Sequence, residues 1–196
     1  MEQVVRMCLK HGVQLGAHPG YPDREHFGRE TLHLPADEIS QFVFEQVRSL
    51  DAVARAQGVE VRHVKPHGAL YNQAARDATV ARAIAEGMGR WNRRLILVGP
   101  AGCEALQSWR EQGFSVAAEV FTDRRYEPDG SLRARSRSNA LISGPQEAAK
   151  QAQLASEGRL RAWDGSELAV DATTICIHSD TPGALDIARG VRRVLG

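Results

Sequence analysis

The fold class is decided by the stretch Val61-Arg62-His63-Val64-Lys65-Pro66-His67-Gly68, residues 61–68 of the chain. A short run with apolar ends leads into a turn that contains a lysine, a proline, a histidine and a glycine. This pattern predicts a β-strand over residues 60–64 that ends in a tight turn. Residues 13–17 lead into His18 in the same way, and residues 174–177 lead into His178. In parallel α/β folds the ligand binds at the carboxyl ends of the strands, so we expect these three turns to line one site.

Strands and helices alternate along the chain. We expect strands at residues 13–17, 60–64, 95–98, 115–120 and 173–178, and a hairpin over residues 161–170. We expect helices over residues 1–11, 35–58 and 145–158, and a last helix from residue 182 onward. Between them, we expect helical segments that end near residue 90 and at residue 113. This alternation predicts a parallel sheet, open or barrel, in a single domain over residues 1–196. A β/α domain normally begins with a strand, whereas this chain begins inside a helix, so we expect the first strand or two to be missing from this sequence.

The composition is that of a soluble globular protein, with 42% hydrophobic and 25% charged residues in 196. The formal net charge of +1 gives no electrostatic reason to expect nucleic acid or an anionic membrane as a partner. No apolar run approaches the roughly 20 residues of a membrane helix, and the start lacks a signal-peptide pattern. The three cysteines, Cys8, Cys103 and Cys176, are far apart and form no CxxC pair. We therefore expect a cytoplasmic protein without a disulfide framework or a zinc-thiolate site.

The first two turns contain candidate metal ligands and bases. His18 and Asp23 share one proline-braced turn, so they are candidates for a metal ligand or a general base, although both residues can equally serve to build an exposed turn. Lys65 at a strand end can hold a carboxylate or phosphate or act as a base, and His67 lies two residues on. The alternative is a solvated lysine beside a turn histidine. Asn72 adds a hydrogen-bonding group on the segment that follows.

The fourth strand and its loop add acidic and basic groups. Glu119 lies inside an apolar strand, where a carboxylate is costly unless it is paired or exposed, so it is a candidate base or a sheet-edge residue. Asp123 and Arg124 follow and either bind substrate or form an ordinary ion pair. The alternating Arg133, Arg135 and Arg137 are an anion-binding group or a solvated basic loop.

The last turn, residues 178–183, combines a strand-end histidine with a helix start. Asp180 or Thr181 can cap the helix that Pro182 begins, which is the alternative to a role in the site, and the helix N-terminus favours an anionic group nearby. Capping leaves His178 unexplained. The chain has no Walker A loop, GxGxxG, GxSxG or HExxH motif.

Taken together, these stretches resemble the LamB/YcsF family. The matching stretches are residues 16–23 with 27–29, 64–72, 119–121 with 123, 124 and 126, 129–132 with 135, and 178–184, in the family's order. The resemblance implies an irregular parallel β/α barrel akin to the sugar deacetylases. It further implies the role of the A subunit in an ATP-hydrolysing 5-oxoprolinase, which opens 5-oxo-L-proline to L-glutamate with the B and C subunits as partners. The family's opening strands, with their acidic and histidine motifs, have no counterpart here, and Ser179 and Asn139 stand where the family usually has glycine.

Residue chemistry and position, rather than the resemblance, suggest the roles within the site. The predicted catalytic residues are Lys65, His67, Glu119 and Asp123. The predicted substrate-binding residues are His18, Tyr21, Arg29, Asn72, Arg124, Arg135 and Thr181. A divalent metal, if one is used, is predicted at His18, Asp23, His178 and Asp180, and ATP is the expected co-substrate.

Two other hypotheses stay open at this point. A metal-dependent carbohydrate deacetylase would use the same histidines and aspartates as ligands. A chain without its first strands would persist only as an inactive scaffold. An exposed sheet edge at the front of the chain would also favour self-association.

Overall fold

The structure is a computed structural model that describes residues 1–196. The chain divides into two compact units, Met1–Ala117 and Ala118–Gly196. The single domain expected from the sequence stays a prediction.

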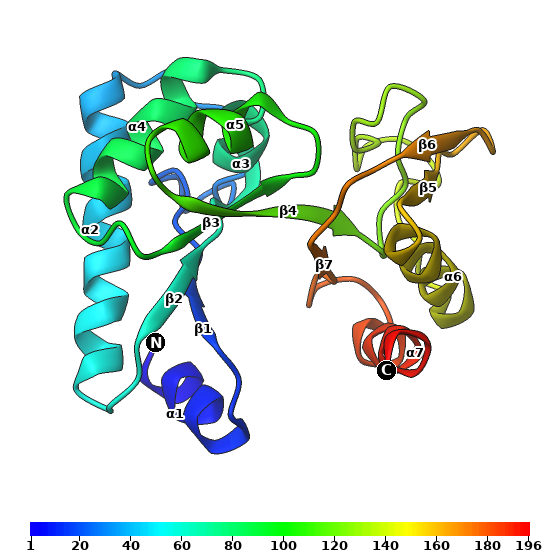
Figure 1. Ribbon diagram of the computed structural model, residues 1–196, viewed down its shortest axis with the longest axis horizontal. Helices are drawn as coiled ribbons and strands as arrows, with labels where there is room; N and C mark the ends of the chain where they lie inside the picture. Colours follow the sequence, from blue (N-terminus) through cyan, green and yellow to red (C-terminus); the bar gives the residue numbers. More distant parts are fainter. The chain divides into compact units, whose positions relative to one another are not determined.

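Most of the expected elements are present, each within a few residues of its predicted bounds (Figure 1). The first unit contains α1 (Glu2–His11), β1 (Leu15–Ala17), α2 (Ala36–Arg55), β2 (Val61–Val64), α3 (Gly68–Ala74), α4 (Ala78–Gly89), β3 (Ile96–Pro100) and α5 (Glu104–Glu111). Strand β4 (Ser115–Phe121) runs from the first unit into the second. The second unit continues with α6 (Pro145–Ser156), β5 (Arg159–Arg161), β6 (Glu167–Ala169), β7 (Thr174–Cys176) and α7 (Ala184–Leu195).

The main sheet is parallel and has the strand order β1-β2-β3-β4-β7. Ala17 pairs with Val64 at the ends of β1 and β2, and Phe121 pairs with Cys176 at the ends of β4 and β7. The order is linear and does not close, as in an incomplete parallel β/α barrel. The predicted α/β class is therefore confirmed. Strands β5 and β6 form a separate antiparallel hairpin around Asp164 and Gly165, as expected.

Helices α2 and α4 pack side by side over the strands of the first unit (Figure 1). They bury apolar side chains at helical spacing, including Val43 and Val47 of α2 and Ile84 and Met88 of α4. Gly87 lets the two backbones approach closely, because a Cβ at this position would lie 2.5 Å from the carbonyl oxygen of Ser40.

The core of the second unit lies between α6 and α7. Its buried cluster consists of Ile142, Ala148, Ala152, Ile187 and Val191, with Ile175 and Ile177 packed against it.

Two local features concern α1 and α7. The apolar residues of α1 fall on one face of the helix, yet only Val5 is buried, whereas Val4 and Leu9 are both 58% exposed. Helix α7 begins at Ala184, two residues after Pro182, and its N-cap is Gly183 with a left-handed φ of 76°. No side chain caps this helix, so capping explains neither Asp180 nor Thr181. The hydroxyl of Thr181 bonds to Asp123 instead.

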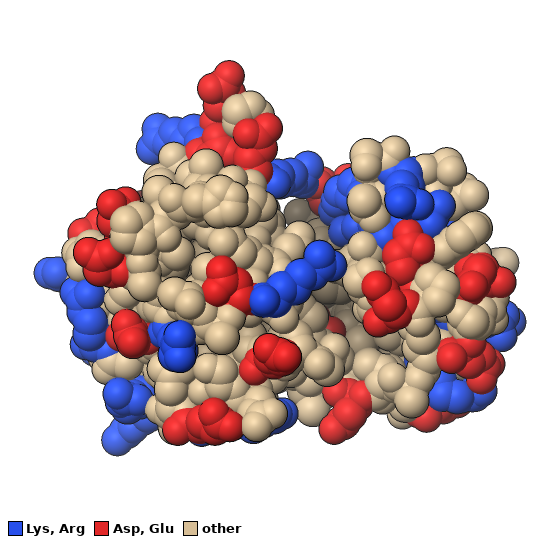
Figure 2. Space-filling view, turned by 90° about the horizontal axis from the view of Figure 1, so that it is seen from above, with Lys and Arg blue, Asp and Glu red and all other residues tan.

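None of the helices combines the length and the apolar character needed to cross a bilayer. Basic and acidic side chains are interspersed over the face seen in Figure 2, in keeping with the net charge of +1.

Candidate functional site

Two histidine clusters lie at strand ends, one in each unit. In the first, the rings of His18 and His67 meet after β1 and β2, with Nδ1 of His67 3.0 Å from Nε2 of His18. In each ring, the nitrogen that does not face the other histidine faces a backbone carbonyl instead. Nδ1 of His18 lies 2.6 Å from the oxygen of Lys65, and Nε2 of His67 lies 2.8 Å from that of Phe27.

These contacts show which ring nitrogens of His18 and His67 carry a hydrogen. A carbonyl oxygen only accepts, so Nδ1 of His18 and Nε2 of His67 must each donate. If both rings were neutral, the two facing nitrogens would then present lone pairs to one another. Their contact is a hydrogen bond only when the pair holds one additional proton. This arrangement can therefore take up and release a proton, or bind an electrophile in its place.

The backbone around the pair is tied together across long sequence separations. The amide of Lys65 donates to Ala17 at 3.0 Å and that of His67 to Pro19 at 2.8 Å. Gly68 has a φ of 55°, and a Cβ there would lie 2.4 Å from the oxygen of Gly28. A glycine is required at this point so that the first turn of α3 can pass close to the loop after β1.

Phe27 shows backbone strain next to the pair. It has a φ of 57°, which is unusual for a bulky residue. The residue is 69% exposed, yet its ring lies edge-on to that of His67, with 5.2 Å between centroids. Its carbonyl accepts the hydrogen bond from His67. The strained peptide therefore fixes the orientation of the His67 ring.

Asp23 lies with His26 rather than with His18. Its Oδ1 accepts from the backbone amide of His26 at 3.0 Å and is 3.1 Å from the ring Nδ1. The backbone hydrogen bond from His26 is the main cause that lowers the pKa of the Asp23 carboxyl. The predicted pairing of Asp23 with His18 at a metal is thus not visible within this unit.

The other predicted residues of the first unit surround this cluster at different depths. Tyr21 is buried and donates to Gln73 at 2.6 Å, and burial raises the pKa of its phenol. Lys65 Nζ lies 5.6 Å from the ring centroid of Tyr71. The Arg29 guanidinium lies 5.6 Å from the ring of Phe27, and Asn72 is exposed on α3.

The second cluster is centred on the buried carboxylate of Asp123, whose side chain is 0% exposed. Its Oδ2 accepts from Thr181 Oγ1 at 2.6 Å and from the backbone amide of His178 at 3.0 Å. Nδ1 of His178 lies 2.9 Å from Oδ2 and 3.1 Å from Oδ1. The His178 ring is stacked on Phe121, with 5.0 Å between centroids and 13° between planes. Asp123, His178 and Thr181, all predicted site residues, are brought together here.

The pKa of Asp123 is set by two opposing effects. Burial alone would raise it, but the hydrogen bonds from His178 and Thr181, with the charge of His178, outweigh burial and lower the pKa below its ordinary value. Asp123 is therefore an acceptor at neutral pH. Nδ1 of His178 must then donate, so when the ring is neutral its lone pair is on Nε2.

Arg124 and Arg135 supply positive charge in the same unit. Arg124 is 7% exposed, and its Nη2 donates to the carbonyl of Arg133 at 2.6 Å. Its Nε is buried without a hydrogen-bond partner. Burial and the nearby Arg135 lower the pKa of Arg124. Arg135 lies 3.7 Å from Asp180. A buried guanidinium without a carboxylate at ion-pair distance is a candidate for binding an anion.

Glu119, the fourth predicted catalytic residue, is buried in β4 opposite Thr174 of β7 and is 5% exposed. Nearby, two residues that sequence reasoning missed hold the turn of Asp123. Gln151 of α6 donates to the carbonyls of Phe121 at 2.6 Å and Arg124 at 2.8 Å. The hydroxyl of Tyr126 accepts from the amide of Phe121 at 2.7 Å, and burial raises the pKa of its phenol. The available signal for Gln151 was a polar residue on the apolar face of a predicted helix.

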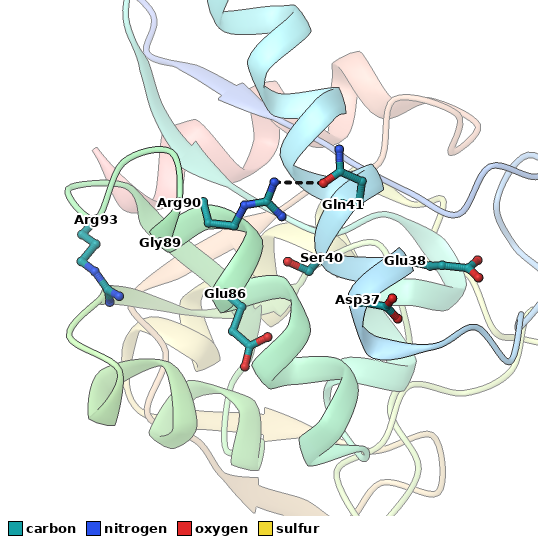
Figure 3. Close-up of a pocket in the computed structure, with 8 residues that line it drawn as sticks. All are labelled: Asp37, Glu38, Ser40, Gln41, Glu86, Gly89, Arg90 and Arg93. Atoms are coloured by element: carbon teal, nitrogen blue, oxygen red, sulfur yellow. Dashed lines mark hydrogen bonds between the residues drawn. The ribbon is translucent and has the colours of Figure 1, made fainter.

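A surface pocket of the first unit lies along α2 and α4 and includes neither His18 nor His67 (Figure 3). Figure 3 shows Arg90 donating to Gln41, at 2.9 Å, above acidic side chains of both helices. The lining residues are Asp37, Glu38, Ser40, Gln41, Glu86, Gly89, Arg90 and Arg93. None of them belongs to the predicted site.

The predicted metal ligands do not form a metal centre within either unit. No group of three or more His, Cys, Asp or Glu side chains is arranged so that it could hold a metal ion. His18 and Asp23 lie in the first unit and His178 and Asp180 in the second. His18, Asp23 and His178 are hydrogen-bonded to other residues, and Asp180 faces Arg135. A divalent ion stays a prediction, and no step proposed below passes through one.

Comparison with known proteins relates the whole chain to one group. The A subunit of 5-oxoprolinase from Chloroflexus aurantiacus is 50% identical over 196 residues, which cover 100% of this chain and 78% of the relative. The A subunit of 5-oxoprolinase from Pyrococcus furiosus is 42% identical, over 100% of this chain and 77% of the relative. The crystal structure of the lactam utilization protein from Thermus thermophilus matches with a TM-score of 0.91 at 42% identity, over 99% of this chain and 78% of that one.

The sequence profile of the LamB/YcsF family matches residues 1–196, the full extent of the chain. Together with relatives of this identity and coverage, this match shows that the chain belongs to the LamB/YcsF family.

Proposed function

We propose that this protein is the A subunit of a cytoplasmic, ATP-dependent 5-oxoprolinase, which hydrolyses 5-oxo-L-proline to L-glutamate together with the B and C subunits. The observation that supports the proposal most strongly is the 50% identity, over the entire chain, to a relative named as the A subunit of 5-oxoprolinase. The histidine clusters at the ends of parallel strands are the second support, because active sites of such folds lie at these ends.

The chemistry of the substrate explains the need for ATP. The five-membered lactam amide is stable, and its nitrogen is a poor leaving group. Transfer of the γ-phosphoryl group of ATP to the amide oxygen would give ADP and an activated carbon. Attack of water on that carbon and cleavage of the C–N bond would give a free amine and an acyl phosphate. Hydrolysis of the acyl phosphate by a second water would then yield glutamate and phosphate.

Within the first unit, this proposal gives roles to Lys65 and His67. The ammonium group of Lys65 would bind the carboxylate or the transferred phosphate. His67, paired with His18, would remove a proton from the attacking water or return one to the leaving nitrogen, because the pair can gain and lose a single proton between its two rings.

Within the second unit, the buried guanidinium of Arg124 would bind an anionic group of the reactants, with Arg135 beside it. Nε2 of His178 would accept or deliver a proton. Glu119 stays a candidate for activating water.

The test is a reconstitution. The chain is mixed with the purified B and C subunits, and glutamate and ADP are measured with each component omitted in turn. The complete mixture should form both products in equal amounts, and omission of any one of the three proteins, of ATP or of 5-oxoproline should abolish glutamate. A complex built around the Chloroflexus aurantiacus relative serves as the control for the assay.

Failure of this chain to form glutamate in a mixture in which the relative succeeds would contradict the proposal. Release of acetate from an N-acetylated sugar by this chain alone, in the presence of a divalent metal, would favour the deacetylase instead.

A further inference from the structure

Thr181 has an environment that does not suit a residue in contact with substrate. It is 3% exposed, and its hydroxyl donates to Oδ2 of Asp123 at 2.6 Å. Its backbone amide donates to the carbonyl of His178 at 3.3 Å, and its own carbonyl accepts from Ala184 at 3.0 Å. All three polar groups of Thr181 are therefore used within the turn between β7 and α7.

We infer that Thr181 is a positioning residue, which acts through Asp123 to hold the His178 ring in the tautomer with hydrogen on Nδ1 and the lone pair on Nε2. The use of Nε2 in catalysis rests on the proposed function, but the tautomer itself does not. Thr181 was predicted to bind substrate, and the geometry points to this different role.

The carboxylate of Asp123 could otherwise rotate about its terminal bond. Thr181 Oγ1 and the amide of His178 both donate to Oδ2, so that this oxygen is held in one place. Nδ1 of His178 then faces both oxygens, at 2.9 and 3.1 Å. An ionised carboxylate only accepts, so the ring must donate from Nδ1.

The other side of the ring is left available. Phe121 covers one face of the imidazole, and the side chain of His178 is 27% exposed. Nε2 has no hydrogen-bond partner in the structure, in contrast to Nδ1. The carboxylate of Asp123 thus sets which nitrogen is presented outward, and the threonine hydroxyl helps to hold that carboxylate against Nδ1.

Thr122, which directly precedes Asp123 in the sequence, offers a matched control for a substitution of Thr181. It is 0% exposed, and its hydroxyl has no hydrogen-bond partner. Replacing it with valine removes a buried hydroxyl next to Asp123 without removing a bond to the carboxylate.

The test uses nuclear magnetic resonance of protein labelled with ¹⁵N-histidine, at about pH 8.5, where an ordinary imidazole is neutral. The His178 signals are assigned with His178→Gln. In the wild type, and in Thr122→Val and Thr181→Ser, the shifts should show the Nδ1–H tautomer. Thr181→Val should shift His178 toward a mixture of tautomers.

Asp123→Asn is a second, independent variant in case Thr181→Val does not fold. Its amide can donate to Nδ1, so His178 should move to the Nε2–H tautomer. In the reconstituted enzyme, Thr181→Val should lower kcat about 10-fold with little change in KM, the usual scale for losing an outer partner of a functional histidine, and serine should restore it.

The inference is overturned if Thr181→Val keeps the wild-type tautomer, if serine fails to restore it, or if Asp123→Asn leaves His178 unchanged. Because the spectra need neither substrate nor partner proteins, these results are separate from success or failure of the proposed reaction.

Discussion

Asp123 is a fully buried carboxylate that stays ionised because its neighbours donate hydrogen bonds to it. Burial would raise its pKa, and the hydrogen bonds of His178 and Thr181 reverse that effect. The protein thus gains stability from the ionised form, since the pKa is lower in the folded than in the unfolded chain.

This difference predicts a loss of stability in acid. The contribution of Asp123 to the free energy of unfolding is complete above the pKa of about 3.9 that this group has in the unfolded chain. It disappears as the pH falls through the lower pKa of the folded protein. Urea unfolding between about pH 2.5 and pH 6 should show a smaller acid loss in Asp123→Asn than in the wild type. Asp186→Asn, which removes an exposed carboxylate of α7, controls for the change in charge. Equal acid losses in wild type and Asp123→Asn would contradict the assignment.

At the scale of the element, the close contact of α2 and α4 depends on Gly87. A methyl group there would have to displace the backbone of Ser40, 2.5 Å away, rather than a flexible side chain. Gly89, in the same helix, faces only side-chain atoms of Arg93 at 3.2 Å.

Gly87→Ala should therefore lower the free energy of unfolding by about 1–3 kcal/mol, the usual cost of overpacking. Gly89→Ala should leave it unchanged or raise it, because alanine favours a helix more than glycine does. Chemical denaturation of both variants checks the pair. A Gly87→Ala protein as stable as the wild type would show that the two helices are not packed as described.

The sequence was sufficient to predict the strands and helices, because each buried element has its own apolar period and its own Pro or Gly boundary. The family resemblance also singled out position 139, where asparagine stands in place of the family's usual glycine. In the structure Asn139 has a φ of 58°. Asparagine tolerates this left-handed conformation better than most residues.

The pairings within the site were not predictable in the same way. His18 meets His67 across 49 residues, and Asp123 meets His178 across 55. Such contacts depend on the register of neighbouring strands, which no local pattern specifies. The exposure of the apolar face of α1 was not predictable for a related reason, since helical spacing indicates an apolar face and not what covers it.

At the scale of the whole molecule, β1 is the outer strand in the order of the sheet, and α1 next to it in sequence exposes Val4, Met7 and Leu9. An open strand edge and exposed apolar side chains favour association with another chain. We expect the isolated protein to self-associate, and Val4→Glu with Leu9→Glu to reduce that association. Light scattering over a range of concentrations is the measurement, and a wild type that stays monomeric would contradict the expectation.

The proposed function gives the cluster after β1 and β2 a part in opening the lactam. The most direct measurement is glutamate formation from 5-oxo-L-proline by the complete complex carrying Lys65→Ala or His67→Ala. Two matched controls replace exposed residues, Arg62→Ala on β2 and His33→Ala in the loop before α2. Unfolding curves of all four variants report whether the fold is kept.

We predict that Lys65→Ala and His67→Ala each lose at least about 100-fold in turnover, the scale of a lost acid–base or charge-stabilising group, while folding as the wild type does. The two control variants should retain their activity. Near-normal turnover in both Lys65→Ala and His67→Ala would contradict the account.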